Sequence, residues 1–70
     1  IHLKLELSNN DIVDKSSIYI FEVLKGSKFT IQLNLSDNNI TIEGIKSLAE
    51  VSKESKITKL NLRDNKIGDE

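Results

Sequence analysis

Apolar and polar residues alternate in three short segments of the chain, Lys4–Leu7, Gln32–Leu35 and Lys59–Leu62. Alternation with a period of two predicts a short strand with one buried face. The segments belong to three copies of the pattern L-x-L-x-x-N-x-I, which start at Leu5, Leu33 and Leu60. Because one strand recurs in each copy, we expect the strands to stack as a parallel sheet, and parallel pairing needs a crossover connection.

The residues between the second and third strands predict a helical crossover. Ile45, Leu48 and Val51 follow one another at intervals of three and form one apolar stripe on a helix. Three polar residues on the other face of this helix are left for water, namely Lys46, Glu50 and Lys53. Each repeat is therefore expected to run strand, turn, helix and loop.

A second helix is expected between the first and second strands. Ser16 or Ser17 can cap its start, because a serine hydroxyl accepts hydrogen bonds from the first free backbone amides. Its inner stripe is predicted to consist of Ile20, Val23 and Leu24. Gly26 is placed to end the helix.

An asparagine stands at the same place in each copy, where the chain leaves the strand: Asn10, Asn38 and Asn65. An amide at this place is either a ligand-binding group or a structural one. We favour the structural role, because the side chain offers two donors and an acceptor. Stacked once per repeat, it can satisfy backbone groups that the turn would otherwise bury unpaired.

The stretch from Leu33 to Ile67 combines Asn-x-Ile, Glu43-Gly44, Leu48-Ala49-Glu50 and Leu60-x-Leu62-x-x-Asn65. It resembles the ribonuclease-inhibitor-like subfamily of leucine-rich repeats, and the closing Ile67-Gly68-Asp69-Glu70 resembles the subfamily's usual helix start. The resemblance implies an α/β fold, a right-handed β/α solenoid with parallel strands on the concave face and helices on the convex face. The segment 1–70 would then comprise units of about 1–28, 29–55 and a partial 56–70. Both ends cut through a repeat, so we expect a piece of a longer array.

The chain departs from the subfamily pattern three residues before each strand leucine. His2, Thr30 and Ile57 occupy this position, and only Ile57 is apolar. His2 is interpreted as a strand-edge residue that replaces a core leucine. Phe29 is expected to fill the gap that Thr30 leaves, because the second and third copies lie one residue closer together than the first and second.

The resemblance also implies recognition of a protein partner through the concave face. The residues between the strand leucines are predicted to point onto that face: Lys4, Glu6, Ser8, Gln32, Asn34, Ser36, Lys59, Asn61 and Arg63. The turns add Asp37 and Asp64. Binding hot spots favour Trp, Tyr and Arg, and only Arg63 has that character here. Solvated sheet residues without a binding role are the alternative interpretation.

Composition narrows the class of partner. The chain has 10 basic and 11 acidic side chains and a net charge of −1, and the two signs are interspersed, so a nucleic-acid partner is not expected. No apolar run approaches the roughly 20 residues that span a bilayer, so a membrane is not expected either. The chain has no cysteine and opens without a secretory signal, which favours a cytoplasmic setting.

No arrangement of residues indicates catalysis, a cofactor or a metal site. His2 is the only histidine, and the three glycines are isolated rather than gathered in a phosphate-binding loop. An enzyme is therefore not expected. Two alternatives to a binding module stay open: a segment of a regulatory protein of the GTPase-activating or NOD-like-receptor type, or a purely structural spacer. The open sheet edges at Leu3–Leu7 and Leu60–Leu62 are expected to favour self-association of the isolated chain.

Overall fold

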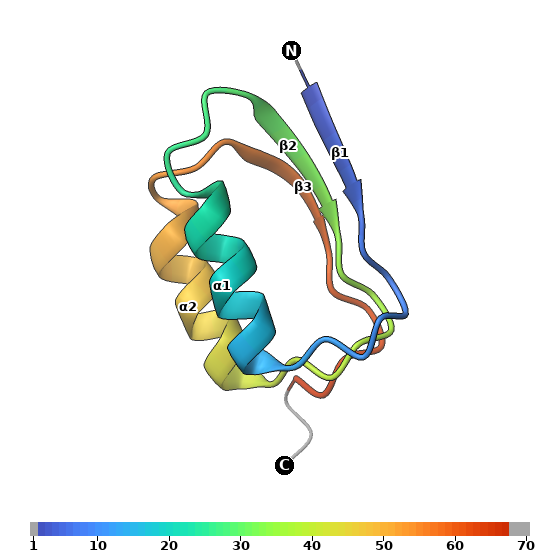
Figure 1. Cartoon of the computed structure of the whole chain (residues 1–70). Coiled ribbons are helices and arrows are strands. Elements are labelled where there is room, and N and C mark those ends of the chain that lie inside the picture. The colour runs from blue at the N-terminus through green and yellow to red at the C-terminus, as the bar shows by residue number, and fades with distance from the viewer. Residues whose placement is uncertain (1, 68–70) are drawn as a thin grey trace.

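Strands and helices alternate along the chain in the computed structural model, which describes residues 2–67. The elements are β1 (His2–Glu6), α1 (Asp14–Leu24), β2 (Thr30–Asn34), α2 (Ile42–Ser52) and β3 (Ile57–Asn61). The strands form one parallel sheet in the order β1-β2-β3, and both helices cover the same face of it (Figure 1). We call the opposite face the open face. The predicted α/β solenoid is confirmed; the predicted helix start at residues 68–70 lies outside the described residues.

Each strand begins two residues earlier and ends one residue earlier than the alternation predicts. His2 and Thr30 are polar, yet they pair with each other in the β1–β2 ladder. Alternation of apolar residues reports only the side chains that face the core, so a strand can extend through polar residues on the open face. Backbone pairing also continues past the strand ends, where the Leu7 amide donates to the Asn34 carbonyl at 2.9 Å.

A β-bulge sets the register between β2 and β3. Ile31 is opposite Ile57 and Leu33 is opposite Leu60, so β3 holds one extra residue, Thr58, between these two pairs. The Thr58 hydroxyl donates to the Ile31 carbonyl oxygen at 3.2 Å. A bulge of this kind places two residues of one strand opposite one residue of its neighbour. The connection between helix and strand is two residues shorter after α2 (Ser52 to Ile57) than after α1 (Leu24 to Ile31), and the extra residue in β3 makes up one of the two.

The bulge overturns the predicted equivalence of His2, Thr30 and Ile57. Ile57 matches Ile31, which in turn pairs with Leu3, so this core position is apolar in all three repeats. His2 is exposed and hydrogen-bonds the Thr30 hydroxyl, and it does not replace a core leucine. Phe29 is 41% exposed and fills no gap. Spacing from the strand leucine misleads here because the bulge changes that spacing.

The core lies between the sheet and the helices and is concentrated in the middle repeat. Buried hydrophobic residues come from both helices, β2 and the turns: Ile12, Phe21, Leu24, Ile31, Leu33, Leu35, Ile40, Leu48 and Val51. The equivalent leucines of the first and third repeats are only partly buried or exposed. The middle repeat has a neighbour on each side, whereas the outer repeats have one each among the described residues.

Helix α2 follows the sequence prediction closely. Leu48 and Val51 are buried and Ile45 is partly buried, while the predicted polar positions are exposed. Thr41 caps the start by accepting a hydrogen bond from the Glu43 amide at 3.3 Å. Gly44 lies in the first turn and is buried against α1.

Helix α1 departs from the prediction at its start and on its inner face. It begins at Asp14 after Val13, so Ser16 and Ser17 are inside the helix and cap nothing. Ser17 is buried with Phe21 and Leu24, whereas Val23 is 80% exposed. The cause is the position of α2, which covers only one flank of α1. Gly26 follows the helix end in the left-handed region at φ 79°, which glycine adopts without strain.

Candidate functional site

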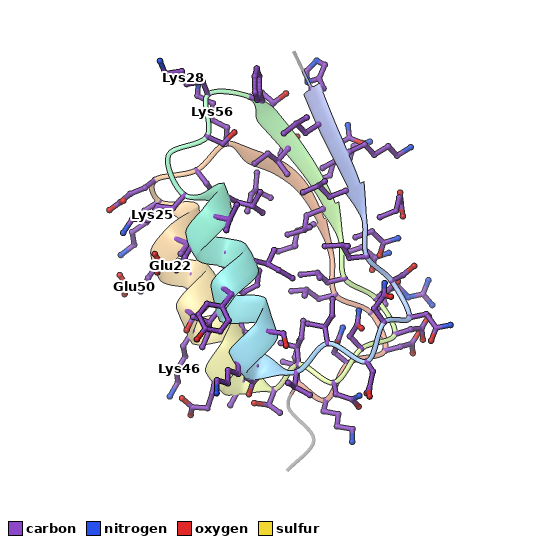
Figure 2. All side chains as sticks on the ribbon, viewed as in Figure 1. Glu22, Lys25, Lys28, Lys46, Glu50 and Lys56 are labelled. Atoms are coloured by element: carbon purple, nitrogen blue, oxygen red, sulfur yellow. The ribbon has the colours of Figure 1, made fainter. Side chains whose placement is uncertain are left out.

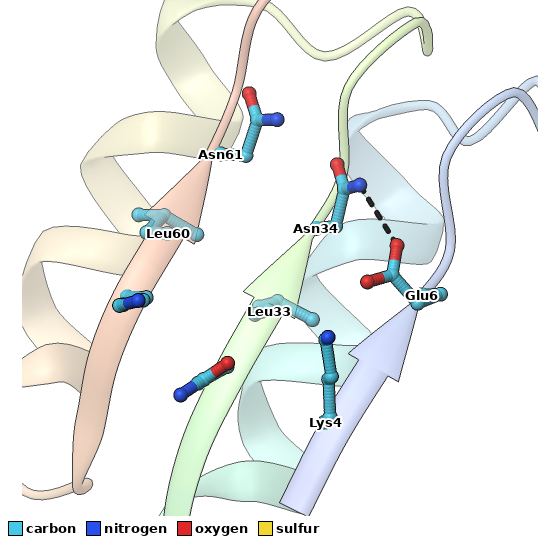
Figure 3. A pocket seen from close by; sticks show the side chains of 8 residues that line it. Lys4, Glu6, Leu33, Asn34, Leu60 and Asn61 are labelled. Carbon is cyan, nitrogen blue, oxygen red and sulfur yellow. Dashed lines mark hydrogen bonds between the residues drawn. The ribbon is translucent and has the colours of Figure 1, made fainter.

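The open face of the sheet carries a shallow hollow of about 400 Å³. Its lining comes from all three strands: Lys4, Glu6, Gln32, Leu33, Asn34, Lys59, Leu60 and Asn61 (Figure 3). Six of these eight side chains are among the residues that the sequence predicts for the concave face. They come together because alternate residues of a strand share one face and the parallel register aligns the repeats.

The hollow is organised in two rows that cross the strands. Strand pairing places Gln32 between Lys4 and Lys59 in one row. Neighbouring strands lie about 4.8 Å apart, so the two lysines start from backbones roughly 10 Å apart. Among residues 2–67, none of these three side chains makes a hydrogen bond or an ion pair with another side chain or the backbone. Two ammonium groups and one amide are therefore free to contact another molecule.

The second row, Glu6, Asn34 and Asn61, is partly engaged within the protein. The Asn34 amide donates to the Glu6 carboxylate at 2.8 Å (Figure 3). The Asn34 side-chain oxygen accepts from the Ser36 amide at 3.0 Å and from its hydroxyl at 2.8 Å. The Asn61 oxygen likewise accepts from the Arg63 amide at 3.0 Å. Both asparagines thus shape the turn that follows their strand, as Asx turns do.

The remaining predicted residues lie outside the hollow. Ser8, Ser36 and Arg63 follow the strands and do not line it. Asp37 and Asp64 are exposed in the turns at φ 57° and 60°. Asp and Asn are the residues other than glycine that most often adopt this left-handed conformation. The backbone therefore explains why aspartate stands at both positions.

Sequence reasoning missed the two leucines of the hollow. Leu33 and Leu60 belong to the apolar set that the alternation assigns to the core, and Leu33 is indeed 2% exposed. Leu60 is 40% exposed, because β3 has no further strand beside it among the described residues. This exposure could have been predicted from the sequence, because the strand at Leu60 is the last of the three predicted strands. Because alternate residues of a strand share one face, the side chains of both leucines lie on the helical side of the sheet, and the hollow on the open face is bordered by polar side chains and strand backbone.

Asn38 connects the turns of the first and second repeats. Its side-chain oxygen accepts from the amides of Asn10 at 2.9 Å and Ile12 at 2.8 Å. Its amide group donates to the carbonyl oxygens of Leu7 at 3.1 Å and Leu35 at 3.0 Å. The side chain is 5% exposed, so water cannot replace these partners freely.

Asn65 repeats this arrangement one unit later, and Asn10 does not. The Asn65 oxygen accepts from the Ile40 amide at 2.9 Å, and its amide group donates to the Leu35 carbonyl at 2.9 Å. Asn10 is exposed, and its amide group donates to the Ser8 carbonyl at 3.1 Å. Asn38 and Asn65 each hydrogen-bond backbone groups in the turn of the preceding repeat. Asn10 makes no such bond, because no turn precedes the first unit within residues 2–67.

The helical side of the protein carries a different, charged surface (Figure 2). A smaller hollow of about 200 Å³ lies between α1 and α2 and includes Glu22, Lys25 and Glu50 in its lining. Exposed ion pairs join Lys25 to Glu54 and Lys46 to Glu43, each at 3.6 Å. Exposed pairs of this kind stabilise a fold by less than about 1 kcal/mol. The surface is typical of a solvated helix face.

Within the described part of the chain, His, Asp and Glu side chains form no group of three that could hold a metal ion. None of the helices between residues 2 and 67 has the length and apolar character needed to cross a membrane.

Comparison with known proteins agrees with the repeat architecture. The family model described as Leucine Rich repeat matches residues 29–49 and 54–70, which together make up more than half of the chain. No curated protein and no solved structure shows significant similarity to the chain. The matched segments contain β2, most of α2 and β3, the elements that form the middle and third repeats. The chain belongs to the leucine-rich repeat family.

Proposed function

We propose that this chain is a protein-binding segment of a leucine-rich repeat scaffold and that it recognises its partner through the open face, the concave side of the solenoid. Leucine-rich repeats generally mediate protein–protein interactions and are typically not enzymes. The observation that carries the proposal is the row of Lys4, Gln32 and Lys59, whose polar groups have no partner within the described residues.

The lining of the hollow fits a protein surface better than a small apolar molecule. The amides and ammonium groups that line the hollow offer hydrogen bonds to carbonyl and carboxylate oxygens. A protein partner presents both kinds of group along an extended segment. The sheet fixes the backbone from which the donors extend, so binding has to order only the side chains, at a cost of about 0.5–1.5 kcal/mol for each one immobilised.

The subfamily is part of the proposal. The strand leucines Leu5, Leu33 and Leu60 recur at intervals of 28 and 27 residues. Each of the two crossovers is a full α-helix of 11 residues. Both features support the ribonuclease-inhibitor-like subfamily, in which a complete helix forms the convex side of every repeat.

Two matched triple variants test the role of the open face. The first combines Lys4→Ala, Gln32→Ala and Lys59→Ala. The control combines Lys15→Ala, Lys46→Ala and Ser52→Ala on the helices, all of them exposed. Each variant removes two lysines and one neutral polar side chain, so their net charges are the same.

The measurement is affinity capture from a cell extract, followed by quantification of the captured proteins. We expect the open-face variant to lose proteins that the wild type and the helix variant both retain. Circular dichroism verifies that the three chains fold alike. Retention of every captured protein by the open-face variant would contradict the proposal, and capture of nothing by any chain would favour the structural spacer.

A further inference from the structure

Lys4, Gln32 and Lys59, which we call the lysine row, cross the open face between two pairs of side chains that already bind each other. On one side of the row, His2 and Thr30 are joined by a hydrogen bond between β1 and β2. The side chains of the lysine row make no hydrogen bond or ion pair within residues 2–67. Both lysines are exposed and the glutamine is half-buried between them.

On the other side of the lysine row, the Glu6 carboxylate accepts a hydrogen bond from the Asn34 amide at 2.8 Å (Figure 3). Glu6 shares the open face with Lys4, two residues away on β1, because alternate residues of a strand point to the same side. No ion pair joins the two among the described residues. Lys4 therefore keeps its charge available to another molecule, although a carboxylate lies nearby.

The charge of the hollow differs in sign from that of the chain. Two lysines and one glutamate line it, which gives a formal charge of +1, whereas the whole chain carries −1. The exposed aspartates Asp37 and Asp64 lie in the turns and do not line the hollow. Charge complementarity therefore favours an acidic partner at the lysine row and disfavours one at the turns.

The spacing of the two lysines matches alternate residues of an extended segment. Two strand spacings separate the backbones of Lys4 and Lys59, which is roughly 10 Å. Two carboxylates at positions i and i+2 of an extended segment point to the same side and lie about 6.7 Å apart. A lysine carries its charge on a flexible stem, so both ammonium groups can lean inward by the small difference. A segment that crosses the strands can thus engage both lysines at once.

Gln32 adds a contact that does not depend on the sequence of the partner. Its side-chain amide offers two donors and an acceptor midway between the lysines. The residue between the two acidic residues of an extended segment directs its own side chain away from the sheet. Its backbone amide and carbonyl are then the nearest polar groups to Gln32. The lysine row offers partners both to the acidic side chains and to the backbone that joins them.

We propose that the open face binds an acidic protein segment in extended conformation, which lies along the lysine row with carboxylates at alternate positions on Lys4 and Lys59. Gln32 hydrogen-bonds the backbone between these carboxylates. The charge of Glu6 keeps the segment from lying one row further along the strands. This inference rests on the proposed binding role of the open face and specifies the chemistry of the partner.

Three synthetic peptides serve as probes. The first has about ten residues, is rich in threonine to favour an extended chain, and carries two glutamates separated by one threonine. The second has the two glutamates side by side, so its charge is the same but the carboxylates point to opposite faces. The third has glutamine in place of both glutamates. Nuclear magnetic resonance titration of the isotope-labelled chain measures each dissociation constant and suits the weak binding expected of exposed ion pairs.

We expect the first peptide to shift the resonances of the lysine row, including the side-chain amide of Gln32. It should bind about threefold or more tightly than the peptide with adjacent glutamates, because only alternate carboxylates reach both lysines. The glutamine peptide should bind far more weakly than either. Binding of the first peptide should weaken as salt is added, since exposed charges are screened.

Charge exchange tests the two lysines. We expect K4E/K59E to weaken binding of the first peptide by about tenfold or more, and to bind a peptide with lysines at the same alternate positions. An unfolded variant would not gain this second affinity. The control K15E/K46E changes two exposed lysines on the helices and alters the net charge equally. It should bind the first peptide within about twofold of the wild type at 0.15 M salt, where screening acts beyond roughly 8 Å.

Glu6→Gln tests the border of the lysine row. The substitution keeps an oxygen that can accept from the Asn34 amide and removes the negative charge beside Lys4. We expect binding of the first peptide to become about twofold or more tighter, because a like charge is removed. Weaker binding would show that Glu6 itself contacts the peptide, which contradicts the proposed position.

Three further results would overturn the acidic partner. One is the absence of shifts at the lysine row up to about 10 mM of the first peptide, since binding should be on the order of 1 mM or tighter. Another is equal binding of alternate and adjacent glutamates, which would indicate unspecific attraction. The third is unchanged binding to K4E/K59E.

These results are separable from the proposed function. If captured proteins depend on the open face but the acidic peptide does not bind, the partner has another chemistry and only this inference is wrong. If capture does not depend on the open face, the proposed function is wrong and this inference is wrong with it.

Discussion

The side-chain oxygen of Asn38 accepts a hydrogen bond at 2.8 Å from the backbone amide of Ile12, a residue of the preceding repeat. Ile12 is 8% exposed, so water does not readily reach this amide. The same oxygen also accepts from the Asn10 amide. One asparagine therefore holds the turn of the previous repeat in place, and the stacking of the repeats depends on it.

Asn38→Ala should lower the free energy of unfolding by about 1–3 kcal/mol, because the buried amide of Ile12 loses its acceptor. Asn10→Ala is the matched control. Asn10 is exposed, and within residues 2–67 its side chain makes one hydrogen bond, to the Ser8 carbonyl, so its removal should have little effect. Urea denaturation of both variants measures the difference. Equal losses in the two variants would contradict a bridging role for Asn38.

Gly44→Ala should destabilise the protein by about 1–2 kcal/mol although alanine is the better helix former. A Cβ at this position would lie 2.6 Å from the Asp14 carboxylate and 2.8 Å from Cγ2 of Ile40. Neither neighbour moves freely, because Asp14 binds Thr41 and Ile40 is fully buried. Ser16→Ala, at the equivalent and exposed position of α1, should leave the thermal midpoint nearly unchanged. A stabilised Gly44→Ala variant would show that the helices can separate at no cost.

Phe21→Ala should lower the free energy of unfolding by about 3–5 kcal/mol, as expected for a fully buried aromatic ring. Val23→Ala removes a side chain that is 80% exposed, and it should change the monomer's stability by less than about 0.5 kcal/mol. Chemical denaturation at a concentration where the chain is monomeric distinguishes the two. If Val23→Ala lowered the free energy of unfolding by more than about 0.5 kcal/mol, Val23 would face the core, as the sequence predicts.

Asp14 and Thr41 form a second link between repeats. The Asp14 carboxylate accepts from the Thr41 amide at 2.7 Å and also hydrogen-bonds the Thr41 hydroxyl. Thr41 in turn caps α2. Thr41→Ala should cost about 1 kcal/mol, the usual value for a lost cap. In a double-mutant cycle with Asp14→Ala, we expect the two losses to be coupled by about 0.5–1 kcal/mol. Strict additivity would mean that the carboxylate does not support the cap.

The open face could be predicted from the sequence to a large extent. Period-two alternation identifies Lys4, Gln32 and Lys59 as neighbours on one face, and the structure places them in one row. The sequence does not predict which side chains of the open face are already hydrogen-bonded within the protein. Asn34 is engaged with both Glu6 and Ser36, and no pattern of residue types reveals such hydrogen bonds. They depend on the distance between side chains of adjacent strands.

The sequence by itself determined the repeat, the alternation of strand and helix, and the course of α2. These follow from local periodicity, which requires only the chain's own geometry. Tertiary structure decided the inner face of α1, where Ile20, Phe21, Val23 and Leu24 are all apolar and periodicity cannot choose among them. Phe21 is buried and Val23 is exposed because α2 covers only one flank. The bulge at Thr58 has the same origin, since a strand's register is set by the neighbour with which it pairs.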